Sequence, residues 1–203
     1  MSASKLAAIV PAAGESRRMG RPKLLLSIGG LPLLSKVIQA LRDGGADPVV
    51  VVCPPADRPE SAPMAELVAI AGAVAVVPER QTIDMRESIE IGLAQLAPTF
   101  QGLFLCPGDT PAVSTELVQA LARFHECEPS AILIPVGPDG RRGHPILLPS
   151  DLALEIPRLP PGVGVNAVIA REPGRVRLVP VENPRVADDL DTPDDYRSWQ
   201  SLD

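Results

Sequence analysis

The sequence predicts an α/β fold with three layers, in which helices cover both faces of a mostly parallel central sheet. Short segments rich in Val, Ile and Leu alternate with segments of helical periodicity. Most of the short segments are apolar throughout rather than at every second residue, which is typical of parallel strands buried on both faces. Hydrophobic residues make up 45% of the chain but aromatic residues only 2%, so aliphatic side chains must fill the core.

The strands and helices are expected to alternate along the chain. Strands are expected at residues 6–10, 48–53, 73–77, 102–106, 131–136 and 176–181. Helices are expected at residues 31–41, 63–71, 85–96 and 115–124, the last with Ser114 as its N-cap. Folds of this kind bind ligands at the carboxyl ends of their strands.

The last third of the chain, residues 137–203, is less regular and rich in Pro and Gly. We expect a small antiparallel excursion of the chain there. Short helices are expected at residues 151–156 and 165–171, and a closing helix from about Pro193 with Thr192 as its N-cap.

Length, charge and cysteine spacing limit the classes of function. A chain of 203 residues fits a single domain, residues 1–203. The formal net charge of −6 argues against nucleic acid as a partner. The apolar N-terminal run is interrupted by Pro11 and is too short for a signal peptide or a membrane span, so we expect a cytoplasmic protein with no membrane partner. Cys53, Cys106 and Cys127 lack the spacing of metal ligands and are expected to be incidental thiols.

The loop after the first expected strand has the chemistry of a phosphate-binding site. It reads PAAGESRRMGRPK from Pro11 to Lys23. The small residues at 12–14 let a ligand approach the backbone, and Arg17, Arg18, Arg21 and Lys23 supply positive charge. The spacing matches neither GxGxxG nor the P-loop. We therefore expect a local grip on an anionic ligand, with a merely solvated basic loop as the alternative.

A carboxylate follows the expected strand at residues 102–106. Asp109 lies in the segment PGDTP, whose Gly and Pro residues favour a turn. Mg²⁺ prefers a few carboxylate oxygens together with phosphate oxygens and water. Asp109 is therefore the first candidate metal ligand, and turn formation alone is the alternative.

A second acidic segment, DDLDTPDDY, spans residues 188–196. Asp194 and Asp195 fall in the first turn of the expected closing helix, where the helix dipole alone explains them. Asp189 and Asp191 alternate along extended chain, so their side chains are expected on the same side, where they can converge on a metal. Like charges held close together require a neutralising cation.

The two histidines receive different interpretations, and one serine joins them as a candidate. His125 ends an amphipathic helix and is interpreted as structural. His144 lies in a Gly-His-Pro turn before a strand, where it either faces a pocket or is a hydrogen-bonded surface residue. Ser88 lies with Arg86 near the start of the helix expected at 85–96, whose N-terminus can meet a phosphate. The alternative there is a capped amphipathic helix that only packs on the sheet.

Together these motifs resemble the MobA-like nucleotidyltransferases, a family that includes the molybdenum cofactor cytidylyltransferases and guanylyltransferases. The motifs are AAGxSxRMGxxKLLL at 12–26, DTP at 109–111, GHP at 143–145 and DLDTPDD at 189–195. The resemblance covers most of the chain and implies a Rossmann-like fold of the nucleotide-diphospho-sugar transferase type. It also implies that residues 1–112 bind the nucleotide, while residues 113–203 bind the acceptor and complete the metal site.

The residues and the resemblance together give a set of candidate site residues. The nucleotide-binding candidates are Ala12, Ala13, Gly14, Arg18, Lys23, Ser88 and Gly108, and the catalytic candidates are Lys23, Arg18 and Asp109. The candidate ligands of Mg²⁺, or of Mn²⁺ in its place, are Asp109, Asp191 and Asp189, with Asp191 preferred over Asp189. The acceptor-binding candidates are His144 and Asn166.

The resemblance also bears on the two substrates. The sequence Ala12-Ala13-Gly14 is similar to the cytidylyltransferase branch, whereas the guanylyltransferase branch tends to carry Ala-Gly-Gly, so CTP is favoured over GTP. In one place the chain departs from those cytidylyltransferases. They usually carry a Gly-Asp-x-Gly-Ala-Arg-like segment after Gly-His-Pro, but residues 162–169 read GVGVNAVI. Either the acceptor differs, or Asn166 and Arg171 contact it in another way.

The expected reaction is attack by a phosphate oxygen of the acceptor on the α-phosphorus of CTP, with release of pyrophosphate. Molybdopterin is the expected phosphorylated acceptor, and a molybdoenzyme the expected recipient of the product. One alternative is a nucleotidyltransferase that acts on a sugar phosphate or polyol phosphate. Another is a cofactor carrier or insertion chaperone that binds without turnover.

Overall fold

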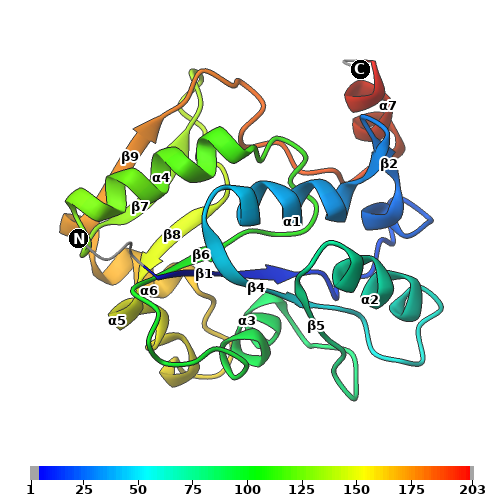
Figure 1. Ribbon diagram of the computed structural model, residues 1–203, viewed down its shortest axis with the longest axis horizontal. Helices are drawn as coiled ribbons and strands as arrows, with labels where there is room; N and C mark the ends of the chain where they lie inside the picture. Colours follow the sequence, from blue (N-terminus) through cyan, green and yellow to red (C-terminus); the bar gives the residue numbers. More distant parts are fainter. Residues whose placement is uncertain (1–4, 202–203) are drawn as a thin grey trace.

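A seven-stranded sheet forms the centre of the protein in the computed structural model, which describes residues 5–201 (Figure 1). The strand order is β5-β4-β1-β6-β8-β7-β9. The strands are β1 (Leu6–Pro11), β4 (Ala46–Val52), β5 (Val74–Val76), β6 (Gly102–Leu105), β7 (Ile132–Val136), β8 (Ile146–Pro149) and β9 (Val176–Pro180). β8 runs antiparallel to β6 and β7, while the other neighbouring pairs are parallel. The α/β class, with an antiparallel excursion in the last third, is confirmed.

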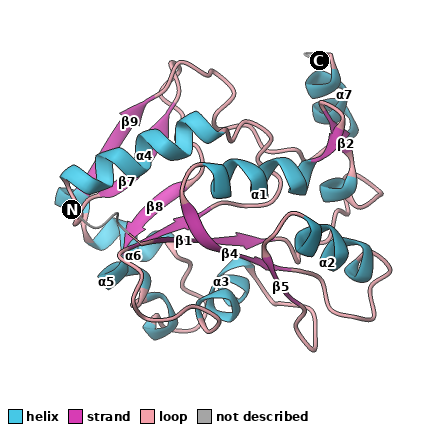
Figure 2. Ribbon diagram, in the orientation of Figure 1, coloured by secondary structure: helices cyan, strands magenta, loops and turns pink. Residues whose placement is uncertain are grey.

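Helices cover both faces of this sheet (Figure 2). One face packs against α1 (Leu33–Asp43), α2 (Ser61–Ile70) and α4 (Thr115–Cys127). Helix α7 (Pro193–Gln200) lies beside the hairpin at residues 27–32 and adds Tyr196 and Trp199 to the same core. The other face packs against α3 (Met85–Leu93), α5 (Ser150–Ala153) and α6 (Asn166–Arg171). No helix within residues 5–201 has the length and apolar character needed to cross a membrane.

The central strand β1 shows why the short segments are apolar throughout. Leu6, Ala8 and Val10 belong to the core on one face of the sheet, whereas Ala7 and Ile9 belong to the core on the other face. Successive side chains of a strand point to opposite faces, so a strand covered on both sides needs an apolar residue at every position.

The expected helix at residues 31–41 begins two residues late, because a small hairpin precedes it. Strands β2 (Ser27–Ile28) and β3 (Leu31–Pro32) pair in antiparallel fashion. Gly29 and Gly30 join them with φ angles of 60° and 78°, as the tightest hairpin turns require. The expectation of helix at Leu31 was wrong because the Gly-Gly turn outweighs the helical periodicity that follows it.

Two other helices differ from the bounds expected from the sequence, one in where it ends and the other because it divides. The helix expected to reach residue 96 ends at Leu93, since its last turn tightens into bonds from the Gln95 N–H to the Gly92 carbonyl and from the Leu96 N–H to the Leu93 carbonyl. The helix expected at 151–156 divides into α5 and a 3₁₀ turn (Ile156–Arg158) that contains Pro157.

The expected N-caps are confirmed. The Ser114 side chain accepts a hydrogen bond from the Leu117 N–H at the start of α4. The Thr192 side chain accepts from the Asp195 N–H, and the Asp195 side chain accepts from the Thr192 N–H, which completes a capping box at α7. Both helices therefore begin where the sequence predicts.

Candidate active site

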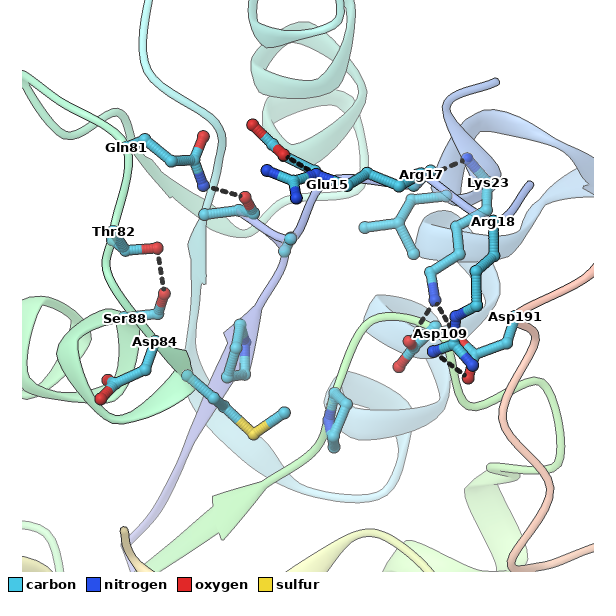
Figure 3. A pocket seen from close by; sticks show the side chains of 18 of the residues that line it. Glu15, Arg17, Arg18, Lys23, Gln81, Thr82, Asp84, Ser88, Asp109 and Asp191 are labelled. Atoms are coloured by element: carbon cyan, nitrogen blue, oxygen red, sulfur yellow. Dashed lines mark hydrogen bonds and ion pairs between the residues drawn. The ribbon is translucent and has the colours of Figure 1, made fainter. Parts of the chain in front are cut away.

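A cavity of about 620 Å³ lies at the carboxyl ends of β1 and β6 (Figure 3). Its lining comes from the loop after β1, from the start of α3 with the segment before it, from the turn after β6, and from Asp191. Figure 3 shows Gln81, Thr82, Asp84 and Ser88 on one side, and Arg18, Lys23, Asp109 and Asp191 on the opposite side. The volume suits a small organic ligand. The cavity lies at the sheet edge where the sequence predicts ligand binding.

Contacts on both sides hold the loop after β1 against the sheet. Ala12 and Ala13 are each only 2% exposed, and the Ala12 N–H donates to the Val52 carbonyl over 2.9 Å. The Ser16 hydroxyl accepts from the Lys23 N–H over 3.2 Å, and the buried side chain of Met19 packs into the core. Residues 13–18 are thereby held along the cavity.

Gly14 adds open space to this loop. A Cβ atom at Gly14 would have no protein atom within 4 Å, apart from Gly14 itself and its two neighbours in the chain. Glycine is therefore not required there by neighbouring protein atoms, and the open space belongs to the cavity that Gly14 lines. A ligand can approach this backbone closely.

Lys23 joins the two acids predicted to be metal ligands. Its Nζ atom lies 2.6 Å from an Asp109 carboxylate oxygen and 2.7 Å from an Asp191 carboxylate oxygen. The Lys23 side chain is 13% exposed. Burial alone would lower the pKa of Lys23, but the two carboxylates outweigh it and the pKa is raised. Lys23 is therefore a fixed cation between two anions.

Arg18 adds a second cation to the same group. Its guanidinium contacts the other Asp191 oxygen at 2.8 Å, while the side chain remains 71% exposed. It can therefore move towards a ligand at little cost, since exposed ion pairs are weak.

A backbone contact brings Asp191 beside Asp109, although the two are far apart in sequence. The Leu190 N–H donates to the Asp109 carbonyl over 2.9 Å, and the Leu190 side chain is fully buried. The carboxylate of Asp195 accepts from the Asp191 N–H over 3.1 Å. The acidic segment is thus fixed on both sides of Asp191.

Asp189 lies near this group without joining it. Its carboxyl makes no ion pair with a residue in the described part of the chain. Asp189 is an exposed residue, yet partial desolvation of its carboxyl, together with repulsion by Asp109 and Asp191, raises its pKa to about 6. Of the two alternating acids, Asp191 is the one that meets Asp109 around Lys23.

The residues present fit a cation that arrives with phosphate oxygens. Within residues 5–201, no group of three or more His, Cys, Asp or Glu side chains has the arrangement of a metal site. Asp109 and Asp191 supply a pair of carboxylates instead. This donor set agrees with the coordination of Mg²⁺, which protein sites usually bind through one or two carboxylates plus substrate phosphates and water.

The α3 side of the cavity is polar and combines the uncharged side chains of Gln81, Thr82 and Ser88 with the carboxylate of Asp84. The Ser88 hydroxyl donates to the Thr82 hydroxyl over 3.0 Å, and the Gln81 amide nitrogen donates to the Ala13 carbonyl over 2.6 Å. The Gln81 amide oxygen is buried without a partner among the described residues. Sequence reasoning identified Ser88 but missed Gln81 and Thr82. Their only sequence signal was a polar segment directly before a capped helix.

The Asp84 side chain caps α3 by accepting from the Glu87 N–H over 2.9 Å, and Ile89 and Leu93 pack on the sheet. The interpretation of this segment as a capped amphipathic helix is therefore confirmed. It is compatible with a ligand at Ser88.

A second cavity, of about 420 Å³, contains both candidate acceptor-binding residues. It is lined by Ile134, Arg142, Gly143, His144, Ile146, Asn166, Ile169 and Ala170. Ile146 at the start of β8 pairs with Leu105 at the end of β6, so His144 lies at the same sheet edge as Asp109. The two cavities are therefore neighbours on one edge.

His144 is a neutral ring in this second cavity. Burial lowers its pKa, and a hydrogen bond to the Leu105 backbone and the charge of Asp109 offset this only partly. Its Nδ1 atom is buried without a partner among the described residues.

Other candidates lie away from both cavities. Gly108 is buried beneath the loop, where an added Cβ would lie 3.2 Å from a Leu24 methyl group, and it does not line the first cavity. The His125 ring is fully buried against Gly102, in keeping with a structural role. Cys53 and Cys106 are buried, and Cys127 is exposed.

This chain is similar in sequence to known nucleotidyltransferases. Residues 8–176 match the family model of the MobA-like NTP transferase domain. A protein of Opitutus terrae described as a "probable molybdenum cofactor guanylyltransferase" is 51% identical over 51 residues, a quarter of each chain. A 2-C-methyl-D-erythritol 4-phosphate cytidylyltransferase of Streptomyces coelicolor is 29% identical over 91% of this chain and 65% of its own length. The chain thus spans less than two thirds of the length of these curated relatives.

A solved structure is similar over the full length. The crystal structure of the protein Rv0371c from Mycobacterium tuberculosis H37Rv superposes with a TM-score of 0.80 at 27% identity, covering 98% of this chain and all of that one. A complex of the same protein with manganese superposes with a TM-score of 0.76. The family model alone matches well over half of the sequence, and the chain belongs to the MobA-like NTP transferase family.

Proposed function

We propose that the protein is a nucleotidyltransferase that uses Mg²⁺ to transfer CMP from CTP to a phosphorylated small acceptor, with molybdopterin as that acceptor. The observation that carries this proposal is the Lys23 ammonium between Asp109 and Asp191, at the edge of a cavity of nucleotide size. Family membership supports the same reaction class.

The first cavity is suited to a nucleoside triphosphate in one orientation. The side with the uncharged polar groups of Gln81, Thr82 and Ser88, where the carboxylate of Asp84 caps α3, suits the base and sugar better than the triphosphate. The side with Arg18 and Lys23 suits the triphosphate, because these cations can offset the charge that grows on the transferred and leaving groups. Ala12, Ala13 and Gly14 lie between the two sides and let the phosphates approach the backbone.

The reaction is attack by an acceptor phosphate oxygen on the α-phosphorus of CTP. The new phosphorus–oxygen bond forms as the bond to the pyrophosphate group breaks. A phosphate nucleophile is already ionised near neutral pH, so no residue has to remove a proton from it. When bound by Asp109 and Asp191, Mg²⁺ supplies charge neutralisation at phosphate oxygens. The contribution of the chain is to position both substrates in line and exclude other orientations.

CTP is the preferred donor in this proposal, with GTP as its competitor. The Ala12-Ala13-Gly14 sequence favours CTP. The Streptomyces coelicolor relative, a cytidylyltransferase, aligns with 91% of this chain, whereas the guanylyltransferase relative aligns with a quarter of it. The loop sequence and the longer alignment support CTP, while the 51% identity of the guanylyltransferase relative over its 51 residues supports GTP as the competitor.

The second cavity is the proposed acceptor site. Arg142 makes no ion pair with any described residue and is suited to an anionic group, while His144 and Asn166 offer neutral hydrogen-bonding groups. The remaining side chains of the lining are largely those of isoleucine, from residues 134, 146 and 169. Apolar walls suit a ring system better than a polyhydroxylated chain, which needs many polar partners. This balance favours a pterin phosphate.

A polyol phosphate is the second candidate acceptor. It is favoured by the 91% coverage of this chain in the alignment with 2-C-methyl-D-erythritol 4-phosphate cytidylyltransferase. In either case, residues 1–112 are proposed to bind the nucleotide, and residues 113–203 to bind the acceptor and complete the metal site. A molybdoenzyme is the proposed recipient of a molybdopterin product.

Pyrophosphate release tests the proposal. Purified protein is supplied with Mg²⁺ and with ATP, CTP, GTP or UTP, each alone, with molybdopterin, and with a panel of sugar and polyol phosphates. We expect release that requires both CTP and molybdopterin. It should be lost in Asp109→Asn but kept in the control Asp151→Asn, which removes a carboxylate that pairs with Arg175 away from both cavities.

Each other outcome has a distinct meaning. Release with a polyol phosphate would replace the acceptor. Tight nucleotide binding without release for any pair would contradict turnover and favour a carrier or insertion chaperone.

A further inference from the structure

The guanidinium of Arg86 is directed away from the nucleotide cavity, although the residue lies in the first turn of α3. The Arg86 side chain is only 13% exposed. Its Nε atom donates to Glu90 over 2.6 Å, one turn further along the helix. Its terminal nitrogens donate to the carbonyls of Leu159 over 2.7 Å, Pro160 over 2.6 Å and Val163 over 3.0 Å. Arg86 therefore binds a distant segment of the chain through three backbone carbonyls.

These carbonyls belong to a tight turn that leads into α6. The Val163 N–H donates to the Pro160 carbonyl over 3.2 Å, and Gly162 has a φ of 76°. Proline followed by a glycine with positive φ is typical of a type II turn. Asn166, the first residue of α6, lies three positions beyond this turn.

The hydrogen bonds of Arg86 connect residues 155–171 to the rest of the protein. Within the described part of the chain, the other hydrogen bonds of residues 155–171 join residues of that segment or its immediate neighbours. Apolar packing of Ile156, Leu159 and Val168 supplies the remaining contact. Apolar packing has little directional preference, whereas three hydrogen bonds to one planar group fix position and orientation.

The two ends of this connection lie at different cavities. The first turns of α3 contribute Met85 and Ser88 to the lining of the nucleotide cavity. Helix α6 contributes Asn166, Ile169 and Ala170 to the lining of the second cavity. Both helices lie on the same face of the sheet (Figure 1). The hydrogen bonds of Arg86 thus join α3 to the turn that directly precedes the α6 wall.

We propose that Arg86 is a positioning residue that couples the two cavities, so that a nucleotide bound against α3 fixes the α6 wall before the acceptor binds. This inference rests on the proposed function, which assigns the nucleotide to the first cavity and the acceptor to the second. Lysine can replace Arg86 only in part, because an ammonium group lacks the planar fork that reaches several carbonyls at once.

Hydrogen–deuterium exchange with CTP and Mg²⁺ tests the coupling without a known acceptor. In the wild-type protein, CTP should slow the exchange of amides in residues 159–171 about tenfold, within the usual range of coupling between sites. In Arg86→Met this slowing should disappear while the CTP affinity from calorimetry stays unchanged. In Arg86→Lys it should be reduced but not absent.

Arg175→Met is the matched control. Arg175 is also a shielded arginine, 24% exposed, which donates to the Ser130 carbonyl and to Asp151 without contacting α3. Its replacement removes a comparable guanidinium near the end of α6 and should leave the effect of CTP on residues 159–171 intact. Equal loss in both variants would indicate general loosening and would overturn the specific role of Arg86.

The remaining outcomes separate this inference from the proposed function. CTP that binds normally and slows exchange in α3 but not in residues 159–171 of the wild type would overturn the coupling alone. Slowing that persists in Arg86→Met would do the same. Failure of the wild type to bind CTP or any other nucleotide would contradict the proposed function itself.

Discussion

Replacing Lys23 by methionine should destabilise the protein in a way that a divalent cation partly reverses. Methionine keeps an unbranched side chain but removes the ammonium between Asp109 and Asp191. Removing one partner of a buried ion pair costs about 3–5 kcal/mol. The carboxylates of Asp109 and Asp191 keep 24% and 29% exposure. Solvent screening therefore reduces the expected loss in the free energy of unfolding to about 2–3 kcal/mol.

Thermal unfolding provides the assay. For a chain of this size, about 2–4 °C of Tm accompanies each kcal/mol, so Tm should fall by roughly 5–10 °C. Mg²⁺ or Mn²⁺ should then raise the Tm of Lys23→Met more than that of the wild type, because the two carboxylates no longer have a cation between them. Lys36→Met, on helix α1 and outside the first cavity, is the control and should behave as the wild type.

Unfolding of Lys23→Met at the wild-type temperature would contradict this prediction, since the ammonium would then contribute nothing to the folded state. An equal rise of both Tm values with the metal would also contradict it. In that case Asp109 and Asp191 would not form the cation site.

Three further predictions concern glycine and histidine positions. Gly14→Ala should leave the unfolding free energy within about 0.5 kcal/mol of the wild type, because a Cβ there meets no protein atom within 4 Å. The same Cβ should weaken CTP binding about tenfold in calorimetry. An unchanged affinity would place the phosphates elsewhere. Gly102→Ala should cost about 1–3 kcal/mol in urea unfolding, since its Cβ would lie 2.9 Å from Leu6 and 3.0 Å from His125. Burial lowers the pKa of His125 from its ordinary value of 6.5. Below about pH 6.5 the unfolded chain therefore binds a proton that the folded chain does not. The unfolding free energy should then fall as the pH drops. His125→Leu should remove that part of the pH dependence, and an unchanged pH profile would show that His125 protonates freely in the fold.

Most of the fold follows from local patterns in the sequence. The continuous apolar character of β1 reflects burial on both faces of the sheet, and the caps at Ser114 and Thr192 begin their helices as expected. The hairpin before α1 was missed because Leu31 also fits the periodicity of the helix that follows. There, the Gly29-Gly30 turn decides the local structure.

The sequence allows the residue types of the candidate site to be predicted, but not all of the contacts between them. The sequence indicates that Lys23 and Asp109 follow two strands of one sheet, so their proximity can be expected. The preference for Asp191 over Asp189 came from the family resemblance, because no local pattern encodes the backbone bond from Leu190 to Asp109 that brings Asp191 to Lys23. Arg86 shows the same limit, since its position in the first turn of α3 suggests a phosphate contact, while its side chain binds a turn far along the chain.

The most direct test of the account follows the fate of each phosphorus atom of CTP. Protein, Mg²⁺ and molybdopterin are incubated with CTP radiolabelled at either the α- or the γ-phosphorus, and the products are separated. The account predicts that the α-label appears in a covalent product with the acceptor and the γ-label in pyrophosphate. Transfer of the γ-label to the acceptor would identify phosphoryl transfer instead and would contradict attack at the α-phosphorus.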